Sequence, residues 1–259
     1  MFIDTHMHLT SKQFNRDREQ VLEQMRIKNI FPGIEIPIDF DSNFLMRNEE
    51  KGLVRINKAA GIHPSRLWKL QPKPEKIIEH ICRFARMDDT VAIGEIGLDH
   101  HITGTEEFWP LQETWMHHFI EIAQTEKLPV ILHIRQAFDD GVRILKEHGY
   151  THEGIIHCFS GSWEEAKQYI NLGLFLGIGG MITMGNGIEE VVKKIPLDYM
   201  VLETDAPYLT PFPFTGRNTP ENIPVIAEKL SKIKGICIDE IERVTTENAK
   251  RIILMKRRK

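Results

Sequence analysis

Short apolar segments alternate with amphipathic segments along the whole chain. The short segments are rich in Val, Ile, Leu and Phe, which predicts buried strands, and the longer ones repeat apolar residues at helical spacing. Strands are expected at residues 2–8, 31–38, 54–61, 91–97, 130–134, 155–159, 174–178 and 201–204. Helices are expected between them at residues 14–28, 41–51, 75–86, 106–126, 137–148, 164–171, 188–193 and 221–232, and a further one at 239–254.

This alternation predicts an α/β protein that forms a single (β/α)8 TIM barrel with an extra C-terminal helix, because eight β/α units are what such a barrel requires. No Gly/Ser-rich linker or change of composition divides the chain, so one domain is expected over residues 1–259. Local signals agree with the expected helix boundaries. Pro129 separates the fourth helix from the fifth strand, and Ser162 with Glu165 forms a capping-box pattern.

Composition excludes few classes of protein. The formal net charge of −4 gives no overall field that would attract nucleic acid or an anionic membrane, although a local basic cleft remains possible. The three cysteines are scattered, which favours reduced thiols and a cytoplasmic location. We see no secretory signal and no apolar run of the ~18 residues that a membrane helix needs, so no membrane association is expected.

Six residues of metal-ligating type lie at or near the carboxyl ends of expected strands. In a parallel barrel these ends meet on one face, so the six side chains are expected to converge. They are His6, His8, Glu95, His133, His157 and Asp205. Each histidine alone could be a buried, hydrogen-bonded residue and each carboxylate could be part of a salt bridge. Their common placement instead favours metal ligation.

Three of the carboxylates are expected to have different roles. Glu95 lies among glycines and isoleucines, where a buried unpaired charge is costly, and so it could bridge two cations. Asp205 could orient the attacking water and accept its proton. Glu203 points to the same face two residues earlier, and we expect it to orient a ligand imidazole rather than bind a metal directly.

Several segments resemble the TatD family of metal-dependent deoxyribonucleases, in the same order and over nearly the whole chain. They are Asp-Thr-His-Met-His at 4–8, Gly-Ile-His-Pro at 61–64, Gly-Glu-Ile-Gly-Leu-Asp at 94–99, Pro-Val-Ile-Leu-His at 129–133, His-Cys-Phe-Ser-Gly-Ser at 157–162, Leu-Glu-Thr-Asp-Ala-Pro-Tyr at 202–208 and Arg-Asn-Thr-Pro at 217–220. The resemblance implies a barrel of the amidohydrolase superfamily, a dinuclear metal centre and hydrolysis of phosphodiester bonds in DNA.

The resemblance also implies how the ligands are divided. One metal would be held by His6, His8, Glu95 and Asp205, and the second by Glu95, His133 and His157. His63 resembles the additional histidine of family sites, close to the scissile phosphate. Its alternative role is a hydrogen bond that anchors its loop. Thr10 and Ile134 depart from the usual family residues, which affects the expected substrate preference rather than the ligand set.

Contacts to substrate are harder to assign from the sequence. Arg135 and Arg217, the latter beside Asn218, could bind phosphates, and each could instead form a salt bridge with a carboxylate. Aromatic side chains on loops of the same face could stack on bases or simply pack their loops; they are Trp68, Trp163, Phe212 and Phe214. The basic residues 256–259 could touch a phosphate backbone, but we expect a solvated terminus.

The preferred function is a deoxyribonuclease with two divalent ions, acting as an exonuclease on single strands or ends of DNA, with RNA as a second candidate substrate. Imidazole ligands favour Zn²⁺ or Mn²⁺, whereas the resemblance implies Mg²⁺ or Mn²⁺. No obligate protein partner is expected. The alternatives are a metal-dependent amide or ester hydrolase, such as an aminoacyl-tRNA deacylase, and a non-catalytic metal-binding barrel.

Overall fold

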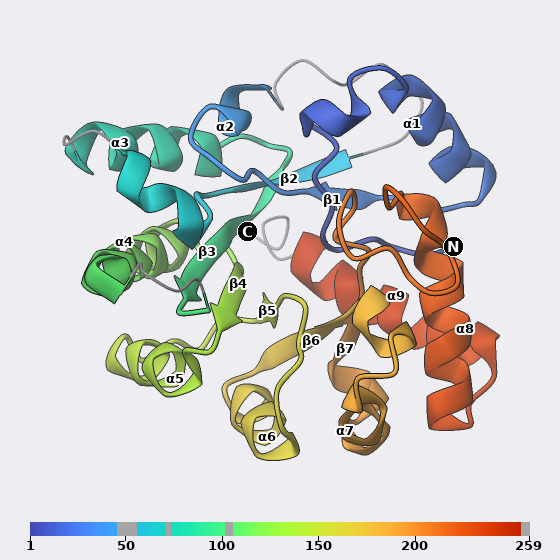
Figure 1. Ribbon diagram of the computed structural model, residues 1–259. Coiled ribbons are helices and arrows are strands. Elements are labelled where there is room, and N and C mark those ends of the chain that lie inside the picture. The colour runs from blue at the N-terminus through green and yellow to red at the C-terminus, as the bar shows by residue number, and fades with distance from the viewer. Residues whose placement is uncertain (46–55, 71–73, 102–105, 255–259) are drawn as a thin grey trace.

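The computed structural model describes residues 1–259 except 46–55, 71–73, 102–105 and 255–259. Within this part of the chain, seven parallel strands form one sheet in sequence order (Figure 1). The strands are β1 (Gly33–Glu35), β2 (Ile56–Ala60), β3 (Thr90–Asp99), β4 (Val130–Arg135), β5 (Gly154–Ile156), β6 (Leu174–Ile178) and β7 (Met200–Leu202). The sheet curls around a central axis, so β1 and β7 approach each other (Figure 1).

The expected first strand at residues 2–8 closes this ring, although it forms isolated bridges rather than a regular strand. Met7 bridges in parallel to Glu35 of β1 and to Ala206, which follows β7. The regular ladder is interrupted because the Asp4 carboxylate accepts the His6 backbone N–H at 3.1 Å. The prediction of an α/β TIM barrel is therefore confirmed, although the N-terminal segment completes it without forming a regular strand.

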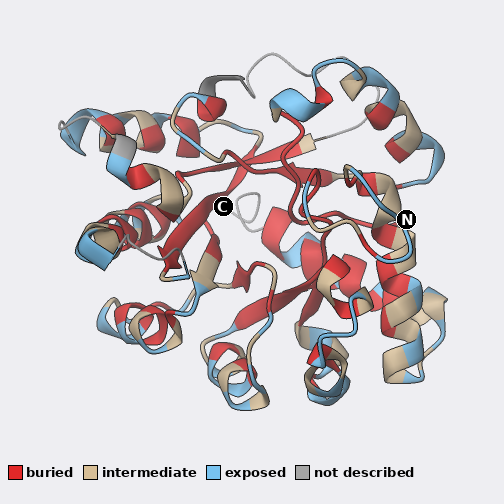
Figure 2. Cartoon of the chain, viewed as in Figure 1, coloured by how far each residue is buried: buried red, intermediate tan, exposed pale blue. Residues whose placement is uncertain are grey.

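Helices cover the outside of the barrel (Figure 1). They are α1 (Arg18–Ile27), α2 (Ser42–Leu45), α3 (Pro74–Ala85), α4 (Trp109–Glu126), α5 (Phe138–Glu147), α6 (Trp163–Asn171), α7 (Ile188–Lys194), α8 (Ile223–Lys234) and α9 (Ile238–Leu254). Short 3-10 helices are η1 (Lys12–Phe14), η3 (Pro64–Lys69), η4 (Glu106–Phe108), η5 (Gly180–Thr183), η6 (Leu197–Tyr199) and η7 (Pro220–Asn222). Strands are buried, whereas helices expose their outer faces (Figure 2).

Several boundaries differ from the expected ones. The first helix begins at Arg18 rather than Phe14, because Ser11 caps the separate turn η1. Strands β5 and β7 end early, since Cys158 and Asp205 adopt positive φ angles of 47° and 58° that turn the chain. The expected helix at 41–51 and strand at 54–61 lie partly outside the described residues. The basic segment 256–259 lies wholly outside them. The capping box at Ser162 and Glu165 is present.

Helix α9 closes the amino-terminal end of the barrel. Its residues Ala249, Ile252 and Ile253 belong to a buried apolar cluster with residues from the strands. That cluster contains Ile131, Ile155 and Val201. Side chains alternate along a strand, so the residues two positions further point into the same interior. Those positions carry His133, His157 and Glu203. An apolar layer therefore fills the amino-terminal end of the barrel, and a polar layer lies next to it at the carboxyl-terminal end.

No helix in the described part of the chain has the length and apolar character needed to span a bilayer. We retain the single domain over residues 1–259 as a proposal. It is supported by one sheet whose strands come from residues 33 to 202 and by α9, which packs against β7 and β3.

Candidate active site

The two histidines of the N-terminal segment face each other in the barrel mouth. The Nε2 atoms of His6 and His8 lie 3.3 Å apart. His8 Nδ1 lies 2.9 Å from the carbonyl oxygen of Ile36, to which it can donate its proton. Its Nε2 atom lies 3.2 Å from Asp205 Oδ1. Burial lowers the pKa of His8, but the hydrogen bond to Asp205 raises it to about 9, so in the metal-free protein the ring is protonated and Nε2 donates to this carboxylate. A hydrogen bond such as that from Nδ1 to Ile36 is typical of histidines that bind a metal through the other nitrogen.

Glu95 lies at the centre of the site, and its two oxygens face different histidines. Oε2 lies 3.4 Å from His6 Nε2, whereas Oε1 lies 3.0 Å from His133 Nδ1 and 3.7 Å from His157 Nε2. Burial raises the pKa of this carboxyl, but the imidazoles of His63 and His6 and the hydrogen bond from His133 hold it well below its usual range. Glu95 is thus a buried anion with one oxygen on each side of the site.

Asp205 reaches the same cavity from the turn after β7. Its Oδ1 atom lies 3.2 Å from His8 Nε2, 3.8 Å from His6 Nε2 and 3.9 Å from His157 Nε2. Burial raises the pKa of Asp205, but the neighbouring imidazoles, led by His157, bring it below its ordinary value. The left-handed backbone at Asp205 aims the carboxylate back into the barrel, and such conformations cluster at functional sites.

His157 is held between two acidic groups and a ring. Its Nδ1 atom lies 2.9 Å from Glu203 Oε1, and its ring stacks on His6 with centroids 3.5 Å apart. Burial lowers the pKa of His157, but the Glu203 and Asp205 carboxylates outweigh burial and raise the pKa to about 10. Glu203 is completely buried and contacts His157 on the side away from the other candidate ligands. It is therefore placed to orient this imidazole.

Asp99 has the same relationship to His133, and the sequence analysis gave it no role. Its Oδ2 atom lies 3.1 Å from His133 Nε2, while the other ring nitrogen faces Glu95. Burial lowers the pKa of His133, but its hydrogen bonds to the Asp99 and Glu95 carboxylates raise it overall. One signal could have identified Asp99: it follows Glu95 by four positions in one strand, which places both on the same face.

His63 anchors its loop and also faces the candidate site; its role beside a phosphate stays a prediction. Its Nδ1 atom accepts the Ser65 backbone N–H at 3.0 Å, which anchors the start of η3. Its Nε2 atom lies 3.5 Å from Glu95 Oε1. Burial lowers the pKa of His63 to about 4, so the ring is neutral at pH 7. With Nδ1 accepting, the proton lies on Nε2 and points into the site.

Among the described residues, donor atoms close enough to share an ion form four groups. They are His6 with His8 and Glu95, His6 with His157 and Asp205, His63 with Glu95 and His133, and His157 with Cys158 and Glu203. This grouping differs from the division implied by the family resemblance, since it places His157 with His6 and adds His63. The assignment of each ligand to one of two ions therefore stays a proposal.

The residues fit a metal centre by their own chemistry. The Nε2 atoms of His6 and His8 lie 3.3 Å apart. His6 Nδ1 is buried and has no hydrogen-bond partner among the described residues. Unpaired buried polar groups and converging carboxylates are costly unless a cation compensates them. Imidazole and carboxylate together are suitable ligands for Zn²⁺ or Mn²⁺.

A profile of the family described as TatD related DNase matches residues 3–254. The chain belongs to this family. It is 36% identical to the uncharacterized metal-dependent hydrolase YabD of Bacillus subtilis, over 97% of this chain and 98% of that protein. It is 30% identical to a mouse protein provisionally named as the deoxyribonuclease TATDN3, over 96% of this chain and 87% of that protein. The crystal structure of the TatD homologue YjjV of Escherichia coli superposes with a TM-score of 0.88 at 28% identity, covering 97% of both chains.

In this TatD-family hydrolase, Asp4 connects the two ends of the site, a relationship that the sequence analysis did not identify. Its buried carboxylate accepts the Thr204 hydroxyl at 2.5 Å and the Thr204 backbone N–H at 3.0 Å, besides the His6 N–H. The segment with His6 and His8 is thereby fixed to the segment with Asp205. Burial raises the pKa of Asp4 to about 7, against the effect of these hydrogen bonds.

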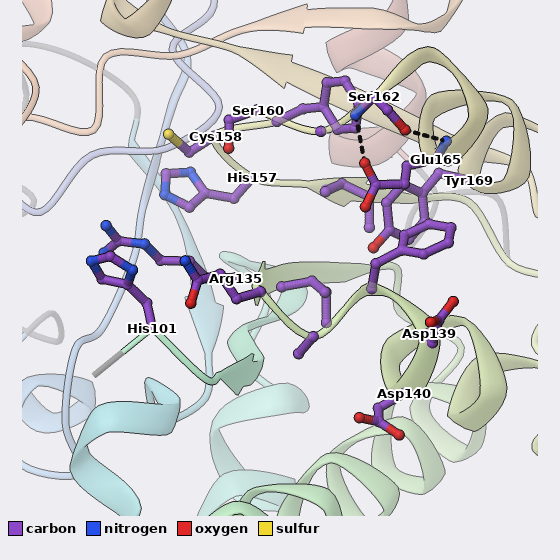
Figure 3. A pocket seen from close by; sticks show the side chains of 17 residues that line it. His101, Arg135, Asp139, Asp140, His157, Cys158, Ser160, Ser162, Glu165 and Tyr169 are labelled. Carbon is purple, nitrogen blue, oxygen red and sulfur yellow. Dashed lines mark hydrogen bonds between the residues drawn. The ribbon is translucent and has the colours of Figure 1, made fainter. Parts of the chain in front are cut away.

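Two cavities meet at the mouth of the TatD-family barrel. The first, of about 220 Å³, is lined by the candidate ligands His8, Glu95, His133, His157 and Asp205, and also by Ile38, His63, Ser65, Arg66 and Tyr208. The second, of about 660 Å³, shares His157 and extends between the starts of α5 and α6. Figure 3 shows Arg135 and His101 on one side of the second cavity, apart from Asp139 and Asp140.

The two arginines expected to bind phosphate differ in their surroundings. Arg135 is exposed in the larger cavity, and no ion pair joins it to Asp139 among the described residues. Arg217 donates to both Asp17 oxygens, at 2.8 and 2.6 Å, and its guanidinium lies 4.4 Å from the centre of the Phe14 ring. Arg217 is therefore already engaged in an ion pair, and a substrate contact from it stays a prediction.

The loop aromatics also divide into two kinds. Trp68 is 54% exposed, and its ring lies 6.3 Å from that of Phe108. Phe212 and Phe214 are 70% and 51% exposed, which leaves much of their rings accessible to a ligand. Trp163 instead packs partly against the apolar core, and Lys167 lies 5.6 Å above its ring. Asn218 is fully buried and donates to the carbonyl oxygens of Thr204 and Tyr208. It holds its loop in place.

Proposed function

We propose that this TatD-family hydrolase is a divalent-metal-dependent deoxyribonuclease that cleaves phosphodiester bonds. The observation that carries the proposal is Glu95, whose two oxygens face separate histidine groups in one buried cavity. This arrangement fits two ions that share a carboxylate. The family description and the name of the mouse relative support DNA as the substrate.

We propose that two divalent ions, Mg²⁺, Mn²⁺ or Zn²⁺, occupy the site. The residues that would hold them are His6, His8, Glu95, His133, His157 and Asp205. When bound, such ions polarise a phosphoryl oxygen and lower the pKa of water. Glu203 and Asp99 would keep His157 and His133 in the tautomer and orientation that ligation needs.

Asp205 is the proposed acceptor for the proton of the attacking water. Its carboxylate is kept ionised by the surrounding imidazoles and lies at the cavity edge rather than at its base. A group of this kind contributes about 10²–10⁴-fold to rate when it transfers the proton in the transition state. His63, neutral and with its Nε2–H directed inward, would donate a hydrogen bond to a phosphoryl oxygen.

Substrate strands would extend from the smaller cavity past His157 into the larger one. Arg135 lies there and would bind a flanking phosphate, and Arg217 is retained as a second candidate. The exposed rings of Trp68, Phe212 and Phe214 suit unpaired bases. These features favour exonuclease action on single strands or ends of DNA, and RNA is retained as a second substrate of the proposal.

The test is release of nucleotides from 3′- and 5′-labelled single-stranded DNA by protein stripped of metal and reloaded with each ion in turn. Stepwise shortening that requires an added ion supports the proposal. Intact DNA together with release of an amino acid from charged tRNA would replace it with an aminoacyl-ester hydrolase. Inertness on both substrates would favour a non-catalytic metal-binding barrel.

We also propose a cytoplasmic location. The support is chemical: Cys82, Cys158 and Cys237 are all free thiols in the structure.

A further inference from the structure

We propose that Arg66 is the residue that binds the phosphoryl group at the reacting position. This inference rests on the proposed phosphodiesterase function and names the cation that would recognise its substrate. Neither the motifs nor the ligand set assigns a role to Arg66, which lies three residues after His63 in η3.

The local structure directs Arg66 into the metal-binding cavity. His63 is the N-cap of η3 and holds the first turn through the Ser65 N–H. In a 3-10 helix, side chains three residues apart eclipse each other. His63 points at Glu95, and Arg66 lines the same 220 Å³ cavity. The cap that fixes His63 therefore fixes the direction of Arg66 as well.

Arg66 has no ion-pair partner within the described part of the protein, although the Glu95 and Asp205 carboxylates line the same cavity. Its Nε atom is buried and has no hydrogen-bond partner, and within the described residues its guanidinium forms no ion pair. It is the single arginine among the described residues that line this cavity. By contrast, Arg217 is held by Asp17, and Arg135 lies in the other cavity. Partial burial of a guanidinium without an adjacent anion costs free energy. The position is therefore suited to an anionic ligand.

The geometry of the guanidinium favours a phosphoryl group over an ester carbonyl. Its planar fork presents parallel donors that match two oxygens of one phosphate. In phosphoryl transfer the charge spreads over several oxygens of the reacting group, whereas attack on an ester develops charge on one oxygen. Tyr208, which is 43% exposed, lines the same cavity and would offer a ring to the bound group. Arg66 thus distinguishes the phosphodiesterase from the ester hydrolase.

The experiment compares Arg66→Ala, Arg66→Lys and Arg66→Gln with the wild-type enzyme loaded with Mn²⁺. The matched control is Arg83→Ala, which removes an exposed guanidinium from the outer helix α3. The substrates are bis(p-nitrophenyl) phosphate and labelled single-stranded DNA. Binding of inorganic phosphate is measured by calorimetry, and metal content by elemental analysis.

We expect Arg66→Ala to lower kcat/KM on both substrates by about 10²–10³-fold, the loss seen when one donor to the developing charge is removed. Phosphate binding should weaken at least about tenfold, since one charge-assisted contact is lost. Metal content should not change. Arg66→Lys should recover part of the activity, and added guanidinium should partly rescue Arg66→Ala. Arg83→Ala should behave as wild type.

Wild-type turnover and wild-type phosphate binding in Arg66→Ala would overturn the inference. Loss of activity that guanidinium does not rescue, with phosphate binding unchanged in Arg66→Gln, would also overturn it and assign Arg66 a structural role. If the wild-type enzyme cleaves neither substrate, the proposed function fails first. Calorimetry still decides the role of Arg66 in that case, because phosphate binding that depends on Arg66 would support it without turnover.

Discussion

Glu203 occupies the space that a side chain on Gly177 would need. Gly177 lies in β6 and Glu203 directly follows β7, and a Cβ atom on Gly177 would lie 2.3 Å from Glu203 Oε2. Glu203 in turn lies 2.9 Å from His157 Nδ1. A glycine in one strand therefore makes room for the carboxylate that orients a candidate metal ligand in another.

Gly177→Ala should displace Glu203 and weaken metal binding. The added methyl group cannot share the buried position with the carboxylate, so His157 loses its orienting partner. Loss of such a partner costs about 10–100-fold in metal affinity. The measurement is metal affinity by competition with a chelator, together with the melting temperature.

Gly179→Ala is the matched control for this variant. Its Cβ atom would lie 3.5 Å from Glu203 Cγ, an ordinary contact, and its φ of −118° suits alanine. It should bind metal as the wild-type enzyme does. Equal affinity in Gly177→Ala and wild type would show that Glu203 does not orient His157.

Asp205→Asn should lower kcat by about 10²–10⁴-fold, the contribution of a general base, while the protein remains folded. The amide keeps the shape of the side chain but has no basic oxygen. Nucleotide release and thermal unfolding should be measured on the same preparation. Undiminished turnover in a folded, metal-loaded variant would contradict the role of Asp205 as proton acceptor.

Metal binding should release protons near pH 7. In the metal-free protein, burial lowers the pKa of His8, but Asp205 and Glu95 raise it to about 9, and the pKa of His157 is about 10. Both rings carry protons at pH 7 that an ion must displace. Metal affinity should therefore increase as the pH rises toward 9.

Calorimetric titration in two buffers with different ionisation enthalpies measures this release. We expect about two protons per protein when the site is filled at pH 7, because two protonated rings become ligands. Heats that do not depend on the buffer would mean that these histidines are already neutral.

Glu35 should make the metal-free protein less stable as the pH rises from about 4.5 to 7. Burial raises its folded-state pKa to about 7, against hydrogen bonds from Leu9 and Thr10, whereas its ordinary value is 4.5. The folded state therefore holds a proton that the unfolded state releases in this range, and stability falls with pH. The effect is at most about 3 kcal/mol.

Chemical denaturation of wild-type and Glu35→Gln protein in EDTA across this pH range checks the effect. Glutamine does not titrate, so the stability advantage of the wild type over this variant should shrink as the pH rises and level off above pH 7. A constant difference would mean that the pKa of Glu35 is not raised.

The sequence predicted the barrel because hydrophobic alternation is a local property. The apolar residues of strands β4 and β5 precede His133 and His157 by a fixed spacing of two, and this places the ligands at one end of the barrel. It did not predict that residues 2–8 form isolated bridges. That outcome depends on the Asp4 carboxylate, which accepts a hydrogen bond from the His6 backbone N–H, a donor that a regular strand ladder would use.

Two roles that depend on a partner distant in the sequence were not predicted, although the orienting role of Glu203 was. Asp99 and Asp4 read as ordinary strand residues until the chain places His133 and Thr204 beside them. Arg217 was expected to bind phosphate, whereas Arg66 was not considered. The fold shows that Asp17 pairs with Arg217 and that Arg66 forms no ion pair within the described residues.

By itself the sequence determined the kinds of donor atom and the end of the barrel at which they gather, because the two-residue period of a strand fixes the direction of each side chain. The tertiary structure decided which oxygen faces which ring, which acidic group orients which histidine, and which arginine is free for an anion. These relationships arise from contacts between distant segments, such as Asp4 with Thr204 and Gly177 with Glu203, and no local pattern encodes them.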